Sequence, residues 1–159
     1  MLLRLIAVAG AMLMLAACSS APEQPAGGPS GPVGSGGAQF GPGSQQDLAA
    51  TAGDRIFFAY DRADISAEAQ QILQRQAEWL RRYSNVSVTV EGHCDERGTR
   101  EYNLALGERR AQAAKNVLVA LGIPATRLST ISYGKERPAV PGSTEEAYAQ
   151  NRRAVTTVN

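Results

Sequence analysis

Histidine, cysteine and aromatic residues are scarce in this 159-residue chain, and their scarcity excludes several kinds of site. The chain has one histidine and two cysteines and contains no C-x-x-C pair, so the usual ligand sets of a zinc site are missing. Only 6% of the residues are aromatic, and the formal net charge is +1. Nucleic-acid-binding proteins normally carry a concentrated basic excess and aromatic rings that stack on bases. We therefore expect no nucleic-acid partner, no metal and no cofactor.

The chain also has no apolar run at its start that is long enough to span a membrane. Arg4 supplies a positive start, and the apolar stretch from Leu5 to Ala17 is shorter than the roughly 20 residues that a transmembrane helix needs. Residues 1–17 are thus typical of a secretory signal peptide. The stretch ends in Leu15-Ala16-Ala17-Cys18, which resembles the lipobox of bacterial lipoproteins. We expect Cys18 to carry acyl chains that anchor the mature protein in a membrane.

Glycine and proline are concentrated in the segment that follows. They fill thirteen of the 22 positions from Pro22 to Gly43. Such a segment has too little apolar surface to offset the entropy lost on ordering. We therefore predict a disordered tether over residues 18–53 and one folded domain over residues 54–159.

The remaining sequence switches between the hydrophobic periods of strands and helices. Val86, Val88 and Val90 alternate with polar residues, as in a strand with one buried face. Apolar residues recur at helical spacing after Ser66 and after Thr99, both of which favour helix N-caps. The predicted elements are a strand at 56–60, a helix at 67–83, a strand at 86–92, a helix at 100–121, a strand at 128–134, a short helix at 144–150 and a strand at 153–158. This order predicts an α+β fold, β-α-β-α-β-(α)-β, with a mixed four-stranded sheet and helices packed on one side.

One charged residue falls within an apolar stripe of the second long helix. Leu106, Arg110, Ala113 and Val117 share one helical face. A half-buried arginine needs an anionic partner because it stays charged. Asp95, on the loop that leads into this helix, is the nearest acidic candidate. Either the two residues form an internal salt bridge, or they stand apart and bind a zwitterion, with Arg110 taking its carboxylate and Asp95 its ammonium group.

Several spaced motifs resemble the signature of a known family. They are Gly92-His93-Cys94-Asp95-Glu96-Arg97-Gly98, Tyr102-Asn103-x-x-Leu106-Gly107-Glu108-Arg109-Arg110-Ala111, Ser132-Tyr133-Gly134-Lys135-Glu136-Arg137-Pro138 and Asn151-Arg152-Arg153-Ala154. In this order, over roughly residues 54–159, they resemble the OmpA-like peptidoglycan-binding domains. The resemblance implies the fold of that family and non-covalent binding to the diaminopimelate of a peptidoglycan stem peptide.

The resemblance also implies roles for residues and partners for the chain. The implied peptidoglycan-binding residues are Asp95 and Arg110 as the two principal clamp positions, Asn103 as a polar lining residue, Arg152 in the last motif, and the backbone of Phe58 and Ala59. The family often has an aspartate at the position of Ala59. The resemblance further implies a lipoprotein sorted to the inner leaflet of the outer membrane, which links that membrane to the cell wall and takes part in cell division. Periplasmic TolB, and TolA as a second candidate, are the implied protein partners.

An enzyme is the alternative. By residue type, His93, Cys94 and Asp95 supply a base, a nucleophile and an orienting group, and Glu91 with Glu96 could form a carboxylate pair. Neighbours on a strand point to opposite faces, so the imidazole and the thiol meet poorly. We therefore expect a binding protein, in which Cys94 packs as a small apolar residue. A cell-wall-degrading enzyme that uses the His93-Cys94-Asp95 loop is the competing hypothesis.

Overall fold

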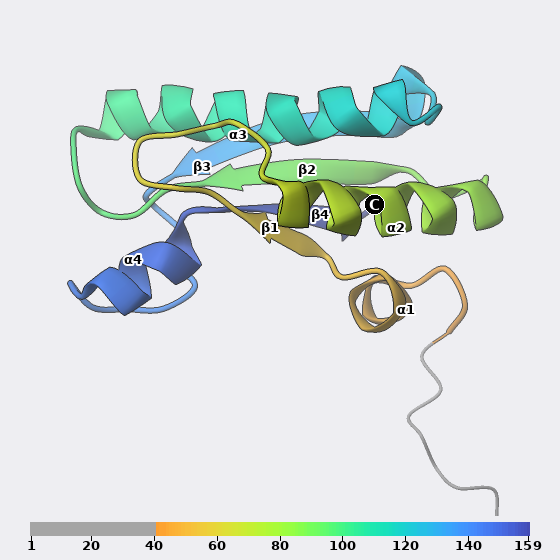
Figure 1. Ribbon diagram of the computed structural model, residues 1–159, viewed down its shortest axis with the longest axis horizontal. Coiled ribbons are helices and arrows are strands. Elements are labelled where there is room, and N and C mark those ends of the chain that lie inside the picture. The colour runs from red at the N-terminus through yellow and green to blue at the C-terminus, as the bar shows by residue number, and fades with distance from the viewer. Residues whose placement is uncertain (1–40) are drawn as a thin grey trace, which may run out of the picture. The chain divides into compact units, whose positions relative to one another are not determined.

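The computed structural model describes residues 41–159, so the predicted signal peptide, Cys18 and most of the predicted tether lie outside the described residues. The elements are α1 (Gln45–Thr51), β1 (Arg55–Phe57), α2 (Ala67–Arg82), β2 (Val88–His93), α3 (Arg100–Ala120), a 3₁₀ turn (Ala125–Arg127), β3 (Leu128–Gly134), α4 (Glu145–Asn151) and β4 (Arg153–Val158) (Figure 1). None of the helices between residues 41 and 159 has the length and apolarity that crossing a membrane requires.

The four strands form one mixed sheet in the order β1-β4-β2-β3. β4 pairs antiparallel with both β1 and β2, whereas β2 and β3 run parallel. Alternate residues of a strand face opposite sides of a sheet, and Val88 and Val90 of β2 are accordingly buried, whereas Thr89 and Glu91 are half-buried. The predicted α+β fold with a mixed four-stranded sheet is confirmed.

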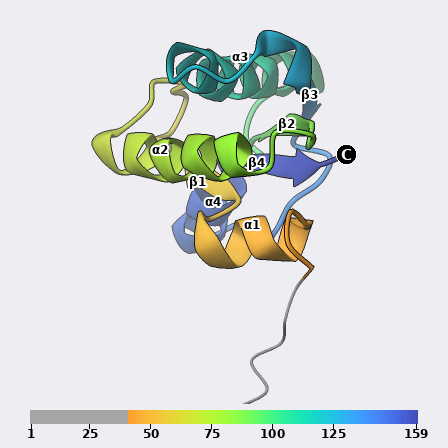
Figure 2. The same ribbon diagram turned by 90° about the vertical axis from the view of Figure 1, so that its right-hand side faces the viewer.

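The two long helices lie next to each other on one face of this sheet (Figures 1 and 2). The hydroxyl of Ser66 accepts a hydrogen bond from the backbone of Ala69 at the start of α2, and that of Thr99 accepts one from Tyr102 at the start of α3. Both predicted N-caps are therefore confirmed. α3 ends at Ala120, and Gly122 follows with a φ of 91°, in the left-handed region that glycine tolerates best.

A pair of glycines lets α3 approach the end of β2. A Cβ added at Gly92 would collide with the backbone carbonyl of Gly107, and one added at Gly107 would collide with the hydroxyl of Ser132. The helix and the strand are thus in backbone contact at this point. This contact fixes the first half of α3, and with it Arg110, above the end of β2.

The folded unit begins earlier than the sequence predicted. Ser44 caps α1 by accepting a hydrogen bond from the backbone of Asp47, and Leu48 has no exposed surface. The indole N–H of Trp79 donates to the Asp47 carboxylate over 3.0 Å. The prediction of a tether up to residue 53 is therefore wrong for residues 44–53. α1 was missed because the sequence before it is rich in glycine and proline and because the helix has only one buried side chain, that of Leu48.

α1 also completes the edge of the sheet. β1 is only three residues long and pairs only with the first half of β4. Beyond it, the side-chain amide of Gln45 donates to the carbonyl of Thr156 over 3.2 Å and accepts from the backbone N–H of Val158 over 2.8 Å. A single side chain thus makes the two hydrogen bonds that a longer β1 would have made. α1 therefore lies at the carboxyl end of β4.

Candidate ligand-binding site

A pocket of about 220 Å³ opens where β2 ends and α3 begins. Its walls come from the loop after β1, the loop between β2 and α3, and the first three turns of α3. The lining residues are Tyr60, Asp61, Cys94, Asp95, Arg97, Gly98, Tyr102, Asn103, Leu106 and Arg110. The pocket is smaller than the 300–1,000 Å³ typical of whole small-molecule sites, so its size suits the end of a chain better than an entire ligand. Asp95 and Arg110, predicted from the sequence, both line it.

Arg110 is fully buried, yet it forms no ion pair with any carboxylate between residues 41 and 159. Its guanidinium donates instead to three backbone carbonyls. Nε bonds to Arg62 over 2.8 Å, Nη1 to His93 over 2.8 Å and Nη2 to Ala59 over 3.1 Å. An internal Arg110–Asp95 salt bridge, the first of the two alternatives, is therefore absent.

The charge of Arg110 persists in this setting. Burial lowers the pKa of Arg110 from its ordinary value, but an arginine remains protonated in proteins. Three of its five N–H groups are used by the backbone carbonyls, which leaves two for a ligand. Arg110 therefore places at the wall of the pocket a positive charge that has no ion-pair partner among residues 41–159.

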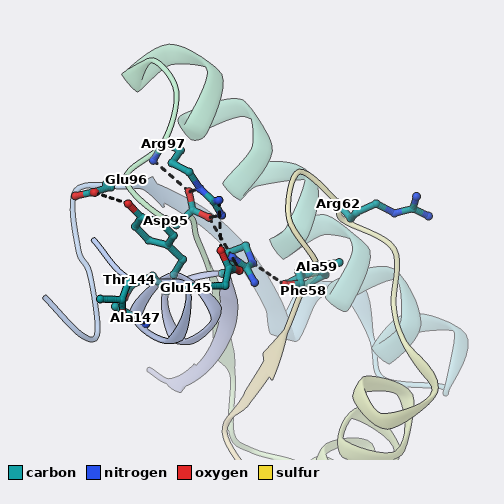
Figure 3. A network of polar contacts seen from close by, with 12 residues as sticks. Phe58, Ala59, Arg62, Asp95, Glu96, Arg97, Thr144, Glu145 and Ala147 are labelled. Atoms are coloured by element: carbon teal, nitrogen blue, oxygen red, sulfur yellow. Dashed lines mark hydrogen bonds and ion pairs between the residues drawn. The ribbon is translucent and has the colours of Figure 1, made fainter. Parts of the chain in front are cut away.

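Asp95, by contrast, already has partners. Its Oδ2 lies 2.6 Å from Nη2 of Arg97 and 3.3 Å from Nη1 of Arg152. Its Oδ1 accepts from the backbone N–H of Arg97 over 3.1 Å and from Nε of Arg97 over 3.2 Å (Figure 3). Burial by itself raises the pKa of Asp95, but the hydrogen bonds from Arg97 and Arg152 outweigh it and hold the pKa below its ordinary value. Asp95 is thus an ionised carboxylate held between two guanidinium groups.

Arg152 approaches Asp95 from outside the pocket lining. It is buried, and its Nε donates to the carbonyl of Phe58 over 3.1 Å. Its Nη1 also lies 2.8 Å from Oε1 of Glu145. The backbone N–H of Phe58 donates in turn to the carbonyl of Arg152 over 2.9 Å. Arg152 therefore ties Asp95 to the end of β1 and to the start of α4.

Phe58 and Ala59 take part through their backbone carbonyls, which accept from Arg152 and Arg110. They are not in the strand, because β1 ends at Phe57 and not at residue 60 as predicted. The chain then turns at Asp61, a non-glycine residue with a φ of 55°, whose carboxylate accepts a hydrogen bond from the hydroxyl of Tyr102. This turn brings the carbonyls of the loop over Arg110.

Asn103 lines the pocket and holds its loop in place. The side-chain amide of Asn103 donates to the carbonyls of Arg97 and Thr99 over 2.7 and 3.0 Å. It is almost fully buried. The structure thus places every predicted residue of the folded domain at or beside the pocket, but it places Asp95, Asn103 and Arg110 on its wall and Phe58, Ala59 and Arg152 behind it.

Arg97 is the pocket residue in contact with Asp95 that the sequence did not single out. Its guanidinium lies between the rings of Tyr60 and Tyr148, 4.1 and 4.3 Å from their centroids, a cation–π arrangement. Its Nη1 also lies 3.4 Å from Oε2 of Glu145. The signal available in the sequence was its position two residues after Asp95 in the same loop, a spacing that favours local side-chain bonds.

His93 and Cys94 point to different surroundings. Both ring nitrogens of His93 lack a hydrogen-bond partner among residues 41–159, and the ring packs against Tyr133. Burial, aided by the charge of Arg153, lowers the pKa of His93 to about 4, so the imidazole is neutral at pH 7. The thiol of Cys94 donates to the carbonyl of Asn103 over 3.3 Å, and burial raises its pKa. These two residues do not form the base–nucleophile pair that the enzyme hypothesis needs.

The fold and the pocket together define a small α+β domain with a charged site at the carboxyl end of a central strand. Residues 57–152 match the family model described as "OmpA family". The chain belongs to the OmpA family, among relatives that carry the name peptidoglycan-associated lipoprotein.

Two of these relatives show how far the similarity extends. The protein of that name from Agrobacterium fabrum is 55% identical over 145 residues, which cover 91% of this chain and 81% of the relative. The one from Pasteurella multocida is 44% identical over 154 residues, which cover 97% and 96% of the two chains. In both cases the similarity extends over more than nine tenths of this chain.

Solved structures agree with this assignment. The crystal structure of the peptidoglycan-associated lipoprotein from Burkholderia pseudomallei is similar with a TM-score of 0.65 and 37% identity, and the match covers 67% of this chain and 90% of that chain. The C-terminal domain of Helicobacter pylori MotB is similar with a TM-score of 0.59 and 23% identity, and the match covers 65% and 84% of the two chains. The second likeness is one of fold alone.

Proposed function

We propose that this chain binds peptidoglycan non-covalently through the diaminopimelate of a stem peptide and, as a lipoprotein of the outer membrane, links that membrane to the cell wall. The observation that carries the proposal is the buried charge of Arg110, which faces the pocket without a carboxylate partner among the described residues. A buried charge without a counter-ion is costly, and a ligand carboxylate relieves that cost.

The distal end of diaminopimelate carries a carboxylate and an ammonium group on one carbon atom. The two free N–H groups of Arg110 suit the carboxylate, because guanidinium and carboxylate groups match as planar forks. Asp95 suits the ammonium group. Each such ion pair has about 4 kcal/mol of Coulomb energy at an effective dielectric constant of 20, before desolvation is subtracted. A pocket of about 220 Å³ takes this end of the residue and leaves the rest of the peptide outside.

The wider role follows from the two ends of the chain. The lipobox-like sequence at Cys18 supplies an attachment to the outer membrane, and the pocket supplies an attachment to the wall. We place the chain in the Tol–Pal system, with TolB and TolA as partners and with envelope integrity and cell division as the processes that it supports. The names of the relatives support the lipoprotein and the wall-binding parts of this proposal.

Sedimentation with purified peptidoglycan tests the proposal. Asp95→Asn should reduce the bound fraction more than tenfold while the circular dichroism spectrum stays native. Glu96→Gln is the matched control, because this substitution also removes one charge and Glu96 is adjacent and exposed. The carboxylate of Glu96 accepts a hydrogen bond from the hydroxyl of Tyr148 and points away from Asp95, as Figure 3 shows for the two carboxylates. Undiminished binding by Asp95→Asn would overturn the proposal.

The wall itself offers a second arm of the test. Peptidoglycan that carries lysine instead of diaminopimelate keeps the ammonium group but has no distal carboxylate. It should bind much more weakly, since nothing then pairs with Arg110. Release of soluble wall fragments by the wild-type chain would instead favour the enzyme hypothesis.

A further inference from the structure

The carboxylate of Asp95 has no free position for a ligand. Two carboxylate oxygens offer about four lone-pair sites. Four donors already occupy them, namely the backbone N–H, Nε and Nη2 of Arg97 and Nη1 of Arg152. A ligand ammonium group can therefore reach Asp95 only by replacing one of these donors.

The donors differ in how easily they can leave. The side chain of Arg152 is 9% exposed and is held by the carbonyl of Phe58 and the carboxylate of Glu145. The side chain of Arg97 is 33% exposed, lines the pocket and is held by Asp95 and, less closely, by Glu145. The guanidinium of Arg97 is thus the exchangeable donor.

We propose that Arg97 is a specificity-determining gate of the pocket: its guanidinium occupies the position of the ligand's ammonium group, and a ligand reaches Asp95 only if it brings a cation that replaces it. This inference rests on the proposed function and names the selection that the same site exerts. A ligand that carries a carboxylate alone contacts Arg110 and leaves the gate closed.

The structure provides a place for the displaced guanidinium. Nη1 of Arg97 is already 3.4 Å from Oε2 of Glu145, whose side chain is 62% exposed. Tyr60 and Tyr148 lie on either side of the guanidinium and can keep their cation–π contacts with it during a small shift. Arg97 therefore exchanges one carboxylate for another, while the ligand supplies the cation that Asp95 loses.

The charges of the site favour replacement of the Arg97 guanidinium by the ligand's ammonium group over addition of that group beside an unmoved Arg97. Arg97 and Arg152 pair with two carboxylates, Asp95 and Glu145, whereas Arg110 has no carboxylate partner among residues 41–159. A ligand carboxylate on Arg110 adds the missing negative charge. An ammonium group added beside an unmoved Arg97 would place a third cation on the Asp95 carboxylate, which Arg97 and Arg152 already share, and this is unfavourable in a partly buried site.

The test measures binding of two peptides to the full chain in detergent by calorimetry. One peptide ends in diaminopimelate with a free distal amine, and the other has that amine acetylated. Arg97→Gln removes the competing charge and should tighten binding of the free-amine peptide roughly tenfold, the effect of one lost charge-assisted contact. Binding of the acetylated peptide should stay unchanged.

Two further variants complete the design. Arg97→Lys keeps the competing cation and should behave like the wild type toward both peptides. Arg100→Gln is the matched control, because Arg100 lies three residues away, is 74% exposed and pairs with Glu136 outside the pocket. Thermal unfolding of each variant checks that the fold is retained.

The outcomes separate the gate from the function on which it rests. If Arg97→Gln weakens binding, or strengthens binding of both peptides equally, the proposed role of Arg97 is wrong, but the proposal that the chain binds peptidoglycan is unaffected. If the wild type and Arg97→Gln both fail to bind the free-amine peptide, the proposed function and the proposed role of Arg97 are both wrong.

Discussion

Arg110 has a structural task beside its proposed task in binding. Its three hydrogen bonds tie the loop after β1 to the end of β2. Arg110→Ala should therefore lower the free energy of unfolding by about 3 kcal/mol, because one buried and two partly buried hydrogen bonds from a charged donor are lost. Urea unfolding followed by Trp79 fluorescence measures this. Wild-type stability of Arg110→Ala would show that the three bonds contribute nothing, and Arg110→Lys, which keeps the charge, is the better variant for wall-binding assays.

His93 makes the stability of the fold depend on pH. Its pKa of about 4 in the folded chain lies below the value of about 6.5 for a free histidine, so the folded chain binds fewer protons between these values. The stabilisation is therefore complete above pH 6.5 and is lost as the pH falls toward 4, on the order of 3 kcal/mol in total. The charged and titratable groups around the ring are Glu91 on β2, Tyr133 on β3, Arg137 in the loop after β3 and Arg153 on β4.

Urea unfolding at several pH values checks this dependence against His93→Phe. Phenylalanine keeps a flat ring against Tyr133 and cannot be protonated. Because His93 is the only histidine of the chain, the variant should lose most of the decline between pH 6.5 and 4. An equal decline in the free energy of unfolding of both proteins would show that carboxylates, and not His93, cause the pH dependence.

At the scale of the elements, the contact between α3 and β2 depends on glycine. A Cβ at Gly92 meets the backbone carbonyl of Gly107, which cannot rotate away as a side chain could. Gly92→Ala should therefore destabilise the domain by about 3 kcal/mol, at the upper end of overpacking. Gly41→Ala, where a Cβ meets nothing within 4 Å, is the control and should unfold at the same urea concentration as the wild type.

The elements with strong local signals could be predicted from the sequence. β3 and β4 have the predicted bounds, and Ser66 and Thr99 cap their helices as predicted, because alternation and capping are encoded within a few neighbouring residues. α1 could not be predicted, since only the tertiary structure shows that Leu48 packs into the core. In this respect local pattern and tertiary contact determine different parts of the fold.

The candidate site divides in the same way. Arg110 was detectable because an arginine in an apolar stripe needs a partner. The occupied state of the Asp95 carboxylate was not fully detectable, because Arg152 reaches Asp95 from 57 residues further along the chain. Glu145, which pairs with Arg97 and Arg152, comes from the same distant segment. Sequence reasoning thus found the two charges of the pocket but not the contacts that occupy one of them.

On the scale of the whole molecule, the folded unit needs α1. A chain that begins at Ser44 should be as stable as the full-length protein, whereas one that begins at Asp54 should lose about 2–5 kcal/mol, the usual cost of deleting one large buried side chain. The second truncation removes Leu48, the Asp47–Trp79 bond and the edge bonds of Gln45. Urea unfolding of both truncations measures the difference, and equal midpoints would show that α1 does not belong to the cooperative unit.

Membrane attachment should depend on one of the two cysteines. Cys18→Ala removes the proposed site of acylation, so the protein should move from the membrane fraction to the soluble fraction after cell lysis. Cys94→Ala is the matched control and should remain with the membrane, because Cys94 is buried beside the pocket. Membrane association of both variants would contradict a lipid anchor at Cys18.

The position of α1 relative to the pocket determines how the domain would carry mechanical force. Gln45 of α1 holds the carboxyl end of β4 at Val158, and the pocket's Asp95 is paired with Arg152, one residue before β4 begins. A pull between membrane and wall would thus run along this six-residue strand, over roughly 20 Å. Its hydrogen bonds to β1 and β2 would be loaded in shear, all at once, and would not unzip one after another. Such a domain could resist sudden stretching of the envelope better than its equilibrium stability alone suggests.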